Sequence, residues 1–584
     1  MKKHTCFTVQ GKPFFSVGAQ LHNSTGYAIG APEGREALQK DRERAFESLE
    51  ALGVNTVAVP VCWDAFEPKE GVFDLDYVRR IIDRVRERGL HAVLLWFATW
   101  KNGQMEYAPV WVKRDRERFV RVRCVDGRET TVMSPFYEAN REQDKRAFVR
   151  LMELLKEYDG QEQTVIAVQV ENEPGMLAAT IRDFSEKGTK SFLGGVPDAL
   201  IGAARAECLA AEAMEETAQK LAAAGQYCGR TQDRRLSPLA QSWAENGRRE
   251  SGSWAEVFGA LGAEFCTAWA IARYIDDIAA AGKQVYDLFL YVNVWMDRCG
   301  NRGWSMAGLD YPSGGAVSKV LEVWETACSH LDAFAPDIYE QEPGCIREAQ
   351  ELYDRRELAF YVPESGLTNV NASMMFEAVG KHRAIGYHVF AAESSLDENG
   401  QITEAARGIR HSFAMLRSAE TLLAGSRPGM RVHTLVQQPG QDASRLQIGD
   451  WLCRVSYAGA SPDFAGWVAM DCRHGKDLRD IGRIPMSLEE ELARGLLFEM
   501  GGNEFYLVGH KVRLYWQKST WTDGSIPVNM LNIQHQAHNM EFLCLEEGHF
   551  EGEGFVTDRI RSGDEARHGI WAQYDCGVIH FVLN

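Results

Sequence analysis

Residues 165–175 read VIAVQVENEPG, a short apolar run that passes directly into two glutamates and an asparagine. The run has the length of a strand, and its continuous apolar character is typical of a parallel strand buried on both faces. In closed parallel sheets the functional residues lie just beyond the carboxyl ends of the strands. This stretch therefore predicts a buried parallel strand with chemically active groups at its end.

The same pattern recurs seven more times within the first 425 residues. The other runs are residues 14–21, 54–61, 92–98, 288–294, 334–338, 359–362 and 385–391. Amphipathic helical patterns separate and follow them, at residues 36–52, 77–88, 146–158, 317–330, 346–356, 371–382 and 404–423. Eight strands alternating with helices predict an α/β fold, a (β/α)8 TIM barrel over residues 1–427. An open doubly wound sheet is the alternative, but no GxGxxG motif follows the first run.

Two regions depart from this alternation. The connection from residue 171 to residue 288 is far longer than the others and contains helical patterns at 199–224 and 254–281. We interpret the second as the barrel's own helix and the rest as a helical insertion at about 176–250, suited to a lid or a subunit contact. After residue 428, strand-length segments replace helices, at 430–437, 445–457, 466–471, 496–499, 503–516 and 577–584. They predict a C-terminal all-β sandwich domain over residues 428–584.

The composition excludes several classes of protein. The 584 residues include 64 Lys and Arg against 82 Asp and Glu, a net charge of −18 with no basic block, which disfavours nucleic acid and anionic membranes as partners. We find no uninterrupted apolar stretch of the ~20 residues that a membrane span needs. The 13 cysteines are scattered, without CxxC or zinc-type spacing. Together with an N-terminus that lacks an apolar leader, they predict free thiols and a cytoplasmic location.

The polar and aromatic residues at the eight strand ends suit a sugar. Carboxylates follow the fourth and seventh runs, and a pyranose needs flat rings for its C–H faces and polar groups for its hydroxyls. Two carboxylates on either side of one bond are what glycoside hydrolysis requires. The candidate sugar-binding residues are Gln20, His22, Asn23, Trp63, Glu67, Trp100, Lys101, Asn102, Asn172, Asn293, Trp295 and Phe390. Glu171 lies two residues before Glu173, and we interpret it as a supporting or ion-paired carboxylate.

Several motifs resemble the clan A glycoside hydrolases. VQVENEPG at 168–175 is similar to the acid/base motif of the family 35 and 42 β-galactosidases, and WDAFEPKEGVF at 63–73 resembles their second-strand region. Segments at 18–24, 94–103, 252–260, 311–317 and 335–339 resemble a bacterial family-35-like group with an extra C-terminal β domain. The resemblance implies that Glu173 is the general acid/base, that Glu364 is the nucleophile, and that Tyr339 donates a hydrogen bond to the nucleophile.

The resemblance implies a retaining, exo-acting β-glycosidase that removes β-galactose from small glycosides or oligosaccharides. It implies no metal and no organic cofactor, and a homo-oligomeric assembly. Three other sugar specificities stay open on the same fold, those of a β-glucosidase, a β-mannosidase and an α-L-arabinosidase. A non-catalytic sugar-binding barrel is the alternative from a different class, but both carboxylates that such a protein could lose are present.

Overall fold

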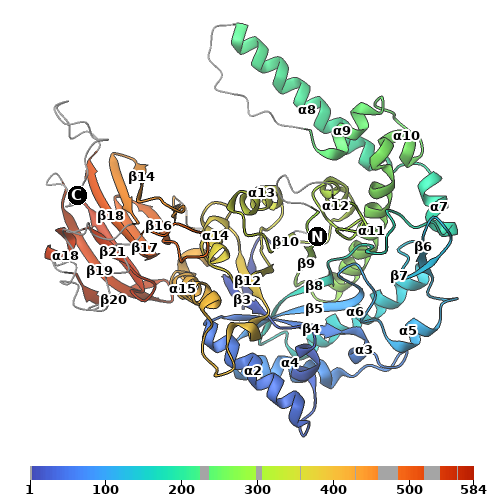
Figure 1. The fold of residues 1–584 in the computed structure, drawn as a ribbon, viewed down its shortest axis with the longest axis horizontal. Helices are drawn as coiled ribbons and strands as arrows, with labels where there is room; N and C mark the ends of the chain where they lie inside the picture. Colours follow the sequence, from blue (N-terminus) through green and yellow to red (C-terminus); the bar gives the residue numbers. More distant parts are fainter. Residues whose placement is uncertain are drawn as a thin grey trace.

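The computed structural model describes residues 3–223, 236–297, 305–355, 357–425, 427, 429–457, 484–518, 540–561, 563–567 and 569–584. Within these ranges the chain folds into a (β/α)8 barrel followed by two packed antiparallel sheets, which confirms the predicted fold class (Figure 1). The predicted strand segment at 466–471 and residues 224–235 of the predicted insertion lie outside the described residues.

Eight parallel strands form the barrel wall. They are β3 (Ser16–Gln20), β4 (Thr56–Cys62), β5 (His91–Lys101), β8 (Val165–Asn172), β9 (Phe289–Val294), β10 (Ala333–Ile338), β11 (Glu364–Ser365) and β12 (Gly386–Phe390). Each strand from β3 to β10 pairs with the next in the list, and β12 pairs with β3. A bridge between Val362 and Tyr387 joins the two remaining neighbours and closes the ring.

The seventh strand differs from its prediction. Residues 359–362 are buried as expected, but the regular strand β11 contains only Glu364 and Ser365, beside Asp337 and Ile338 of β10. Pro363 lies between the two parts and has no backbone N–H to give to a strand ladder. Regular pairing of β10 with the seventh strand is therefore limited to two positions, and Glu364 lies directly at the barrel rim.

Helices cover the outside of the wall. They are α1 (Thr25–Gly30), α2 (Glu36–Leu52), α3 (Trp63–Phe66), α4 (Leu75–Glu87), α5 (Val110–Arg114), α6 (Glu138–Tyr158), α11 (Gly262–Val285), α12 (Leu321–Ala327), α13 (Pro343–Tyr353), α14 (Asn369–Gly380), α15 (Glu404–Ser418) and α16 (Glu420–Ala424). The local sequence explains α4 well. Asp74 caps its first turn by accepting a hydrogen bond from the Tyr77 N–H at 3.0 Å, and Val78, Ile81 and Val85 bury one face at helical spacing.

The barrel has two distinct apolar layers. One lies between the strands and the helices, and the other fills the interior, where Ala58, Leu95, Ala167 and Tyr291 come from four different strands. Phe7 of the hairpin β1 (Phe7–Val9) and β2 (Lys12–Phe14) covers this interior where the barrel strands begin, and packs on Phe289 at the start of β9. Side chains alternate along a strand, so each interior residue predicts that the position two further along also points inward.

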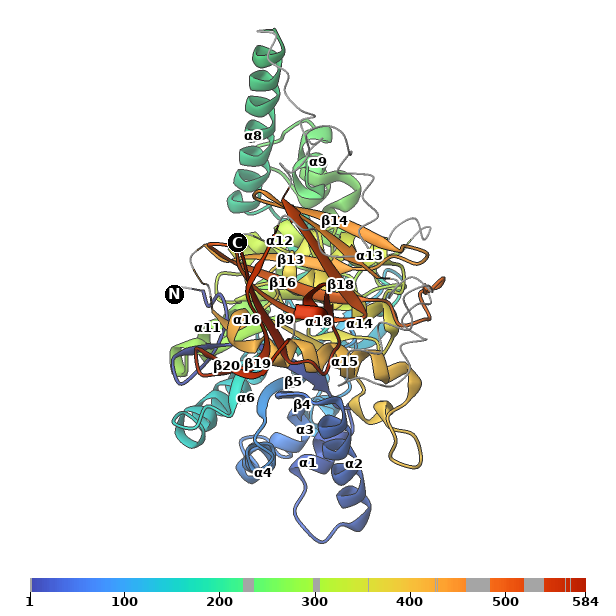
Figure 2. The same ribbon diagram turned by 90° about the vertical axis from the view of Figure 1, so that its left-hand side faces the viewer.

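The long connection after β8 forms a helical projection. It contains α7 (Glu186–Leu193), α8 (Asp198–Ala223), α9 (Pro238–Glu245), α10 (Trp254–Phe258) and the single turn η1 (Gly259–Leu261), and α8 extends away from the barrel (Figures 1 and 2). Residues Trp254–Val285 are long and apolar enough to cross a membrane by length and composition alone. The α11 part of this segment packs against α6 and α12, as expected for a core helix of the barrel.

The C-terminal domain is a sandwich of two sheets. One sheet contains β13 (Arg431–Val436), β16 (Arg494–Gly501), β17 (Glu504–His510), β22 (Val578–Leu583), β19 (Phe542–Glu551) and β20 (Gly554–Ile560) in that spatial order. The other contains β14 (Ala443–Ile448), β15 (Trp451–Ser456), β18 (Val512–Lys518) and β21 (Ile570–Ala572). The predicted segments 445–457 and 503–516 each prove to be two strands, and β19 to β21 were not predicted.

The sandwich lies beside α14 and α15 of the barrel (Figure 1). Buried Arg494 of β16 donates to the Ser412 hydroxyl at 2.6 Å and to the Gly408 carbonyl at 2.7 Å, both on α15. Its guanidinium also pairs with Glu491 at 2.9 Å. The guanidinium is therefore both hydrogen-bonded and paired with a carboxylate, which offsets the cost of burying its charge.

The cysteines agree with the prediction of free thiols except at one position. Nine described cysteines are free, and seven of them, including Cys62 and Cys453, are buried. Cys345 on α13 is disulfide-bonded, so the expectation that every cysteine is reduced is wrong there. The scattered spacing could not reveal this bond, because the distance between two thiols depends on the folded chain.

Candidate active site

Asn293 at the end of β9 links Glu173, Asp337 and Glu364 where the strands end at their carboxyl side. Its Oδ1 accepts a hydrogen bond from the backbone N–H of Glu173 at 2.7 Å. Its Nδ2 donates to Asp337 Oδ2 at 2.8 Å and lies 3.4 Å from Glu364 Oε1. Asn293 is fully buried. The structure gives Asn293 a positioning role in place of the predicted sugar contact, since its amide already bonds the Glu173 backbone and the carboxyl groups of Asp337 and Glu364.

Glu173 follows β8 in a left-handed backbone conformation, with φ of 42°. Burial, and next the negative charge of Glu364, raise the pKa of Glu173 to about 7, although Lys101 and a hydrogen bond from Asp337 oppose the shift. A carboxyl with this pKa is substantially protonated near neutral pH and can give up its proton there. Glu173 therefore has the property that a general acid needs.

Glu364 is buried and hydrogen-bonded at both of its oxygens. Tyr339 donates its hydroxyl to Glu364 Oε2 at 2.6 Å, which is the contact implied by the resemblance, and Asn293 approaches the other oxygen. Burial and the charge of Glu364 raise the pKa of Tyr339 far above its usual range, so the phenol keeps its proton and stays a donor. Donors that face a carboxylate stabilise its ionised form. This arrangement suits a carboxylate that must attack as an anion.

Asp337 is a third carboxyl that the sequence analysis did not select. It is buried at the end of β10, and burial followed by the charges of Glu364 and Glu173 raises its pKa far above the usual range. It shares a hydrogen bond with Glu173. We infer that Asp337 is the protonated donor in this pair. An alternation argument could have found it, because Ala333 and Ala335 of the same strand point into the barrel.

Lys101 brings a positive charge to the carboxyl groups. It ends β5, is 6% exposed, and acts electrostatically on Glu173 and Asp337. Its ammonium donates to the Asn102 side chain and lies 5.0 Å from the centre of the Phe97 ring. Lys101 and Asn102 were both predicted to bind sugar. The structure places them at the rim beside β8, where the Asn102 N–H donates to the Asn172 carbonyl at 3.2 Å.

Glu171 stabilises the backbone near the end of β5. Its buried carboxylate accepts the backbone N–H of Thr99 at 3.2 Å and of Trp100 at 2.7 Å. The pairing of β5 with β8 is irregular between Trp96 and Lys101, and these two bonds satisfy the donors that the irregularity frees. Glu171 thus has a supporting role, as interpreted from the sequence.

Three amide side chains at this end of the barrel are buried without partners. Among the described residues, neither amide atom of Gln20, Gln169 or Asn172 has a hydrogen bond. A buried amide without a partner is costly, so each of these groups calls for a polar ligand or a water molecule. Gln20 and Asn172 were predicted as sugar ligands. Gln169 was not, although alternation from the interior residue Ala167 points to it.

The predicted aromatic and polar rim divides into accessible and buried members. Trp295, Phe390, His22 and Asn23 keep partly exposed side chains, and Phe390 lies edge-on to His22 at 5.6 Å and to Tyr339 at 6.3 Å between ring centres. Trp100 has no exposed surface and packs edge-on against Tyr274 at 4.8 Å. It therefore cannot stack on a sugar in this conformation.

Two further predicted ligands are structural. Trp63 and Glu67 are fully buried, and the Trp63 indole N–H donates to Glu67 Oε2 at 2.8 Å. Glu67 also accepts from the Gly71 N–H at 2.7 Å and pairs with Arg146 of α6. These bonds use the carboxylate to hold the loop after α3, so the prediction that Trp63 and Glu67 contact substrate is wrong. Alternation cannot apply here, because the chain leaves the strand at Cys62.

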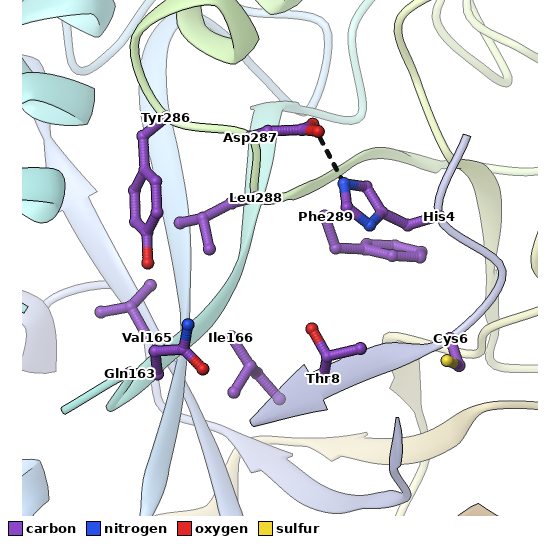
Figure 3. Close-up of a pocket in the computed structure, with 10 residues that line it drawn as sticks. All are labelled: His4, Cys6, Thr8, Gln163, Val165, Ile166, Tyr286, Asp287, Leu288 and Phe289. Atoms are coloured by element: carbon purple, nitrogen blue, oxygen red, sulfur yellow. Dashed lines mark hydrogen bonds and ion pairs between the residues drawn. The ribbon is translucent and has the colours of Figure 1, made fainter. Parts of the chain in front are cut away.

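A separate cavity of about 50 Å³ lies at the opposite end of the barrel (Figure 3). It is bounded by the first residues of β8 and β9 and by the N-terminal hairpin, and His4 pairs with Asp287 at its edge at 3.0 Å. Active sites of such barrels lie at the carboxyl ends of the strands. The cavity is also far smaller than the usual several hundred Å³ of a ligand pocket.

The barrel and its paired glutamates define a site of the two-carboxylate kind that glycoside hydrolases use. Residues 33–206 match the sequence profile of the family described as Beta-galactosidase, and residues 409–573 match that of a Domain of unknown function, DUF5597. The chain resembles the family 42 β-galactosidases in the first of these segments, which confirms the predicted resemblance.

The individual proteins that this chain resembles match it at low identity or over part of its length. A β-galactosidase of Xanthomonas manihotis is 30% identical over 181 residues, which are 30% of this chain and 26% of that enzyme, so the chain spans about a quarter of its length. The solved structure of a catalytic mutant of Gan42B, a family 42 β-galactosidase from G. stearothermophilus, has 13% identity and a TM-score of 0.46, covering 73% of this chain and 59% of that one. The catalytic domain of a β-amylase from Paenibacillus polymyxa gives 13% and 0.45, covering 69% and 98%. Similarity at this level does not distinguish one sugar from another.

Proposed function

We propose that this chain is a retaining, exo-acting β-glycosidase whose preferred substrate carries a terminal β-galactosyl residue. One observation carries the proposal: Asn293 hydrogen-bonds both the Glu173 backbone N–H and the Glu364 carboxylate, so the two glutamates lie in one site. There the pKa of Glu173 is raised to about 7, and Glu364 accepts a hydrogen bond from the Tyr339 hydroxyl. The raised pKa of Glu173 suits an acid, and the Tyr339 and Asn293 donors that face Glu364 suit a nucleophile. The match of residues 33–206 to a β-galactosidase profile supports galactose as the sugar.

The first half of the proposed reaction forms a covalent intermediate. The Glu364 carboxylate attacks the anomeric carbon and forms an ester bond while the bond from this carbon to the leaving oxygen breaks. Glu173 gives its proton to that oxygen, so the aglycone departs as an alcohol. Tyr339 and Asn293 keep Glu364 oriented for the attack.

In the second half Glu173, now ionised, takes a proton from water. The water oxygen attacks the anomeric carbon, the ester bond to Glu364 breaks, and the sugar leaves with its original configuration. Lys101 and the Asp337 hydrogen bond both favour the ionised form of Glu173 and thereby assist this step. The amides of Gln20, Gln169 and Asn172 are fully buried without partners in this conformation, and we propose that movement of the rim side chains opens them to sugar hydroxyls.

A panel of p-nitrophenyl glycosides tests the substrate. We expect the largest kcat/KM on the β-galactoside, compared with the β-glucoside, β-mannoside, α-L-arabinoside and α-galactoside. A higher value on another β-glycoside would keep the mechanism and reject galactose. Saturable binding of galactose without turnover of any glycoside would instead favour the non-catalytic alternative.

The pH dependence should show the proton on Glu173. Only protonated Glu173 can assist departure, and its pKa is raised above the usual value, so kcat/KM on a β-galactoside with a poor leaving group should fall as pH rises through about 7. A 2,4-dinitrophenyl glycoside needs no proton in the first step and serves as the control without this alkaline limb. Equal alkaline limbs for the two substrates would assign the limb to another group.

Asp337→Asn tests whether Asp337 is neutral. An asparagine can still accept from Asn293 and donate to Glu173, so we expect kcat/KM within about tenfold of the parent and an alkaline limb that stays near pH 7. Asp337→Ala removes both bonds and should cost roughly 10²-fold, because one buried hydrogen bond to a charged group contributes about 1.5–3 kcal/mol. If Asp337 is instead ionised, Asp337→Asn will move the limb toward lower pH by a unit or more.

We also propose that the chain assembles into a homo-oligomer through α8. Leu209 and Met214 of this helix are 56% and 53% exposed, and the helix stands clear of the barrel (Figure 2). Replacing both by aspartate should reduce the sedimentation coefficient at micromolar concentration, because apolar contact area is lost. Met486→Asp, at a similarly exposed methionine in the sandwich, is the matched control. A parent chain that sediments as a monomer would reject the assembly.

We propose a reducing, cytoplasmic location for the enzyme. Nine of the described cysteines are free, which supports a reducing compartment, while the disulfide at Cys345 opposes it. Recovery of the chain with periplasmic or secreted markers after cell fractionation would contradict this location.

A further inference from the structure

Three metal-ligating side chains meet on one face of the larger sandwich sheet, away from the carboxyl groups of the barrel. Cys544 and Glu546 lie on β19, and His580 lies on the neighbouring strand β22 directly opposite Glu546. Their donor atoms, Sγ, Oε1 and Nδ1, all lie within 4.8 Å of one another. A register shift between Phe542 and Cys544 places Cys544 and Glu546 on this face while Phe542 packs toward the sandwich core.

From this cluster we propose that Cys544, Glu546 and His580 bind a zinc ion that ties β19 to β22. Thiolate sulfur, imidazole nitrogen and carboxylate oxygen are the three donor types that zinc takes in proteins. Three protein ligands leave the fourth tetrahedral position to water or to an added ligand. We refer to these three residues as the Cys–Glu–His cluster.

The distances within the Cys–Glu–His cluster fit a zinc ion. With bonds of about 2.3 Å to sulfur and about 2.05 Å to nitrogen or oxygen, tetrahedral angles set sulfur and nitrogen about 3.6 Å apart and nitrogen and oxygen about 3.3 Å apart. The structure has 3.9 Å between Cys544 Sγ and His580 Nδ1, and 3.0 Å between His580 Nδ1 and Glu546 Oε1. Shifts of a few tenths of an ångström would seat the ion.

The groups around the cluster orient its ligands. His580 Nε2 lies 3.1 Å from Glu504 Oε1 on β17, so the nitrogen facing away from the cluster can donate its proton to a carboxylate. Ligating histidines usually make such a bond, which leaves the other nitrogen free for the metal. Thr557 donates to the second oxygen of Glu546, and the Tyr506 ring stacks on His580 at 4.6 Å.

Two other histidine clusters show what distinguishes this one. His411, Glu491 and His510 also lie close together, but Glu491 Oε1 already accepts from the buried Arg494 guanidinium at 2.9 Å, which supplies the positive charge. His549 lies between Asp558 at 2.9 Å and Glu551 at 3.5 Å, with its side chain 48% exposed and without a cysteine among its described partners. His549 is therefore the matched control, a histidine between two carboxylates without the thiol.

Metal uptake by the full-length chain tests the proposal. After chelator treatment and buffer exchange, titration with Zn²⁺ should give one site per chain, and Co²⁺ should produce a thiolate-to-cobalt charge-transfer band in the near ultraviolet. Cys544→Ser should abolish the band, His580→Ala should weaken zinc binding at least 100-fold, and Glu504→Gln should weaken it about 10–100-fold. His549→Ala should bind as the parent does.

The outcomes separate zinc binding from an ion triad of His580 with its two carboxylates. If the parent chain takes up no more zinc than Cys544→Ser, or shows no thiolate band with cobalt, the proposal is overturned. A site lost in His549→Ala but kept in His580→Ala would overturn it as well. Absence of the cobalt band from the parent chain overturns the proposal even where a variant fails to fold. A band present in the parent is assigned to this site by its loss in Cys544→Ser or, should that variant fail to fold, in His580→Ala. Because the cluster lies in the sandwich, the parent should hydrolyse p-nitrophenyl glycosides equally with and without zinc.

Discussion

Glu364→Ala should lose turnover on every glycoside, by on the order of 10⁵-fold, as removal of a covalent nucleophile does in other enzymes. The loss should be the same for good and poor leaving groups, because neither can form the ester bond to the enzyme. Each tenfold is about 1.4 kcal/mol of barrier, so this corresponds to roughly 7 kcal/mol. The measurement is kcat/KM on p-nitrophenyl and 2,4-dinitrophenyl β-galactosides.

Azide gives this variant a second readout that depends on geometry. The space vacated by the Glu364 carboxylate lies opposite the leaving group, so azide entering it should yield the α-glycosyl azide by inversion. An unchanged melting temperature and circular dichroism spectrum would show that Glu364→Ala keeps its fold. A loss of less than about tenfold would remove Glu364 from the catalytic pair.

Glu173→Ala should behave differently with different leaving groups. A poor leaving group needs the proton of Glu173, and its kcat/KM should fall by about 10²–10⁴-fold, the usual contribution of general acid catalysis. The 2,4-dinitrophenyl glycoside needs no proton, so its first step should survive. The glycosyl-enzyme should then accumulate on Glu364, because no base remains to activate water.

Azide distinguishes the two glutamates in this variant as well. It needs no general base, so it should restore turnover of Glu173→Ala and release a β-glycosyl azide, the product of two inversions. An α-azide from Glu173→Ala together with a β-azide from Glu364→Ala would show that the roles are exchanged. Denatured-protein mass spectrometry should find the accumulated sugar on the peptide that contains Glu364.

Local pattern was enough to predict the barrel. Continuous apolar runs such as 165–170, each followed by an amphipathic helix, state the strand positions and the burial of both faces, since these depend on neighbours in the chain. Helix α2 begins at Glu36 and ends at Leu52, as predicted, with Gly53 in the left-handed conformation after it. The acid candidate Glu173 and the nucleophile candidate Glu364 were located in the same way, as the polar ends of two apolar runs.

The partners of a strand-end residue could not be predicted locally. Trp63 and Glu67 follow their strand just as Asn102 follows β5, yet both are fully buried. Glu67 pairs with Arg146 of α6, which lies 79 positions after Glu67 in the chain. Asp337 became part of the site only because closure of the barrel brings β8, β9, β10 and β11 side by side. The raised pKa of Glu173 has the same origin, since burial and the charge of Glu364 come from distant strands.

The sandwich shows the same division most clearly. Residues 503–516 read as a single strand because their pattern of apolar residues is nearly continuous. In the folded chain they leave one sheet and enter the other at Lys511, where φ is 57°. The sequence by itself determined which segments extend and which faces are apolar, because these properties are local. Only the tertiary structure decided which strands pair and which polar groups meet, because those contacts join residues far apart in the chain.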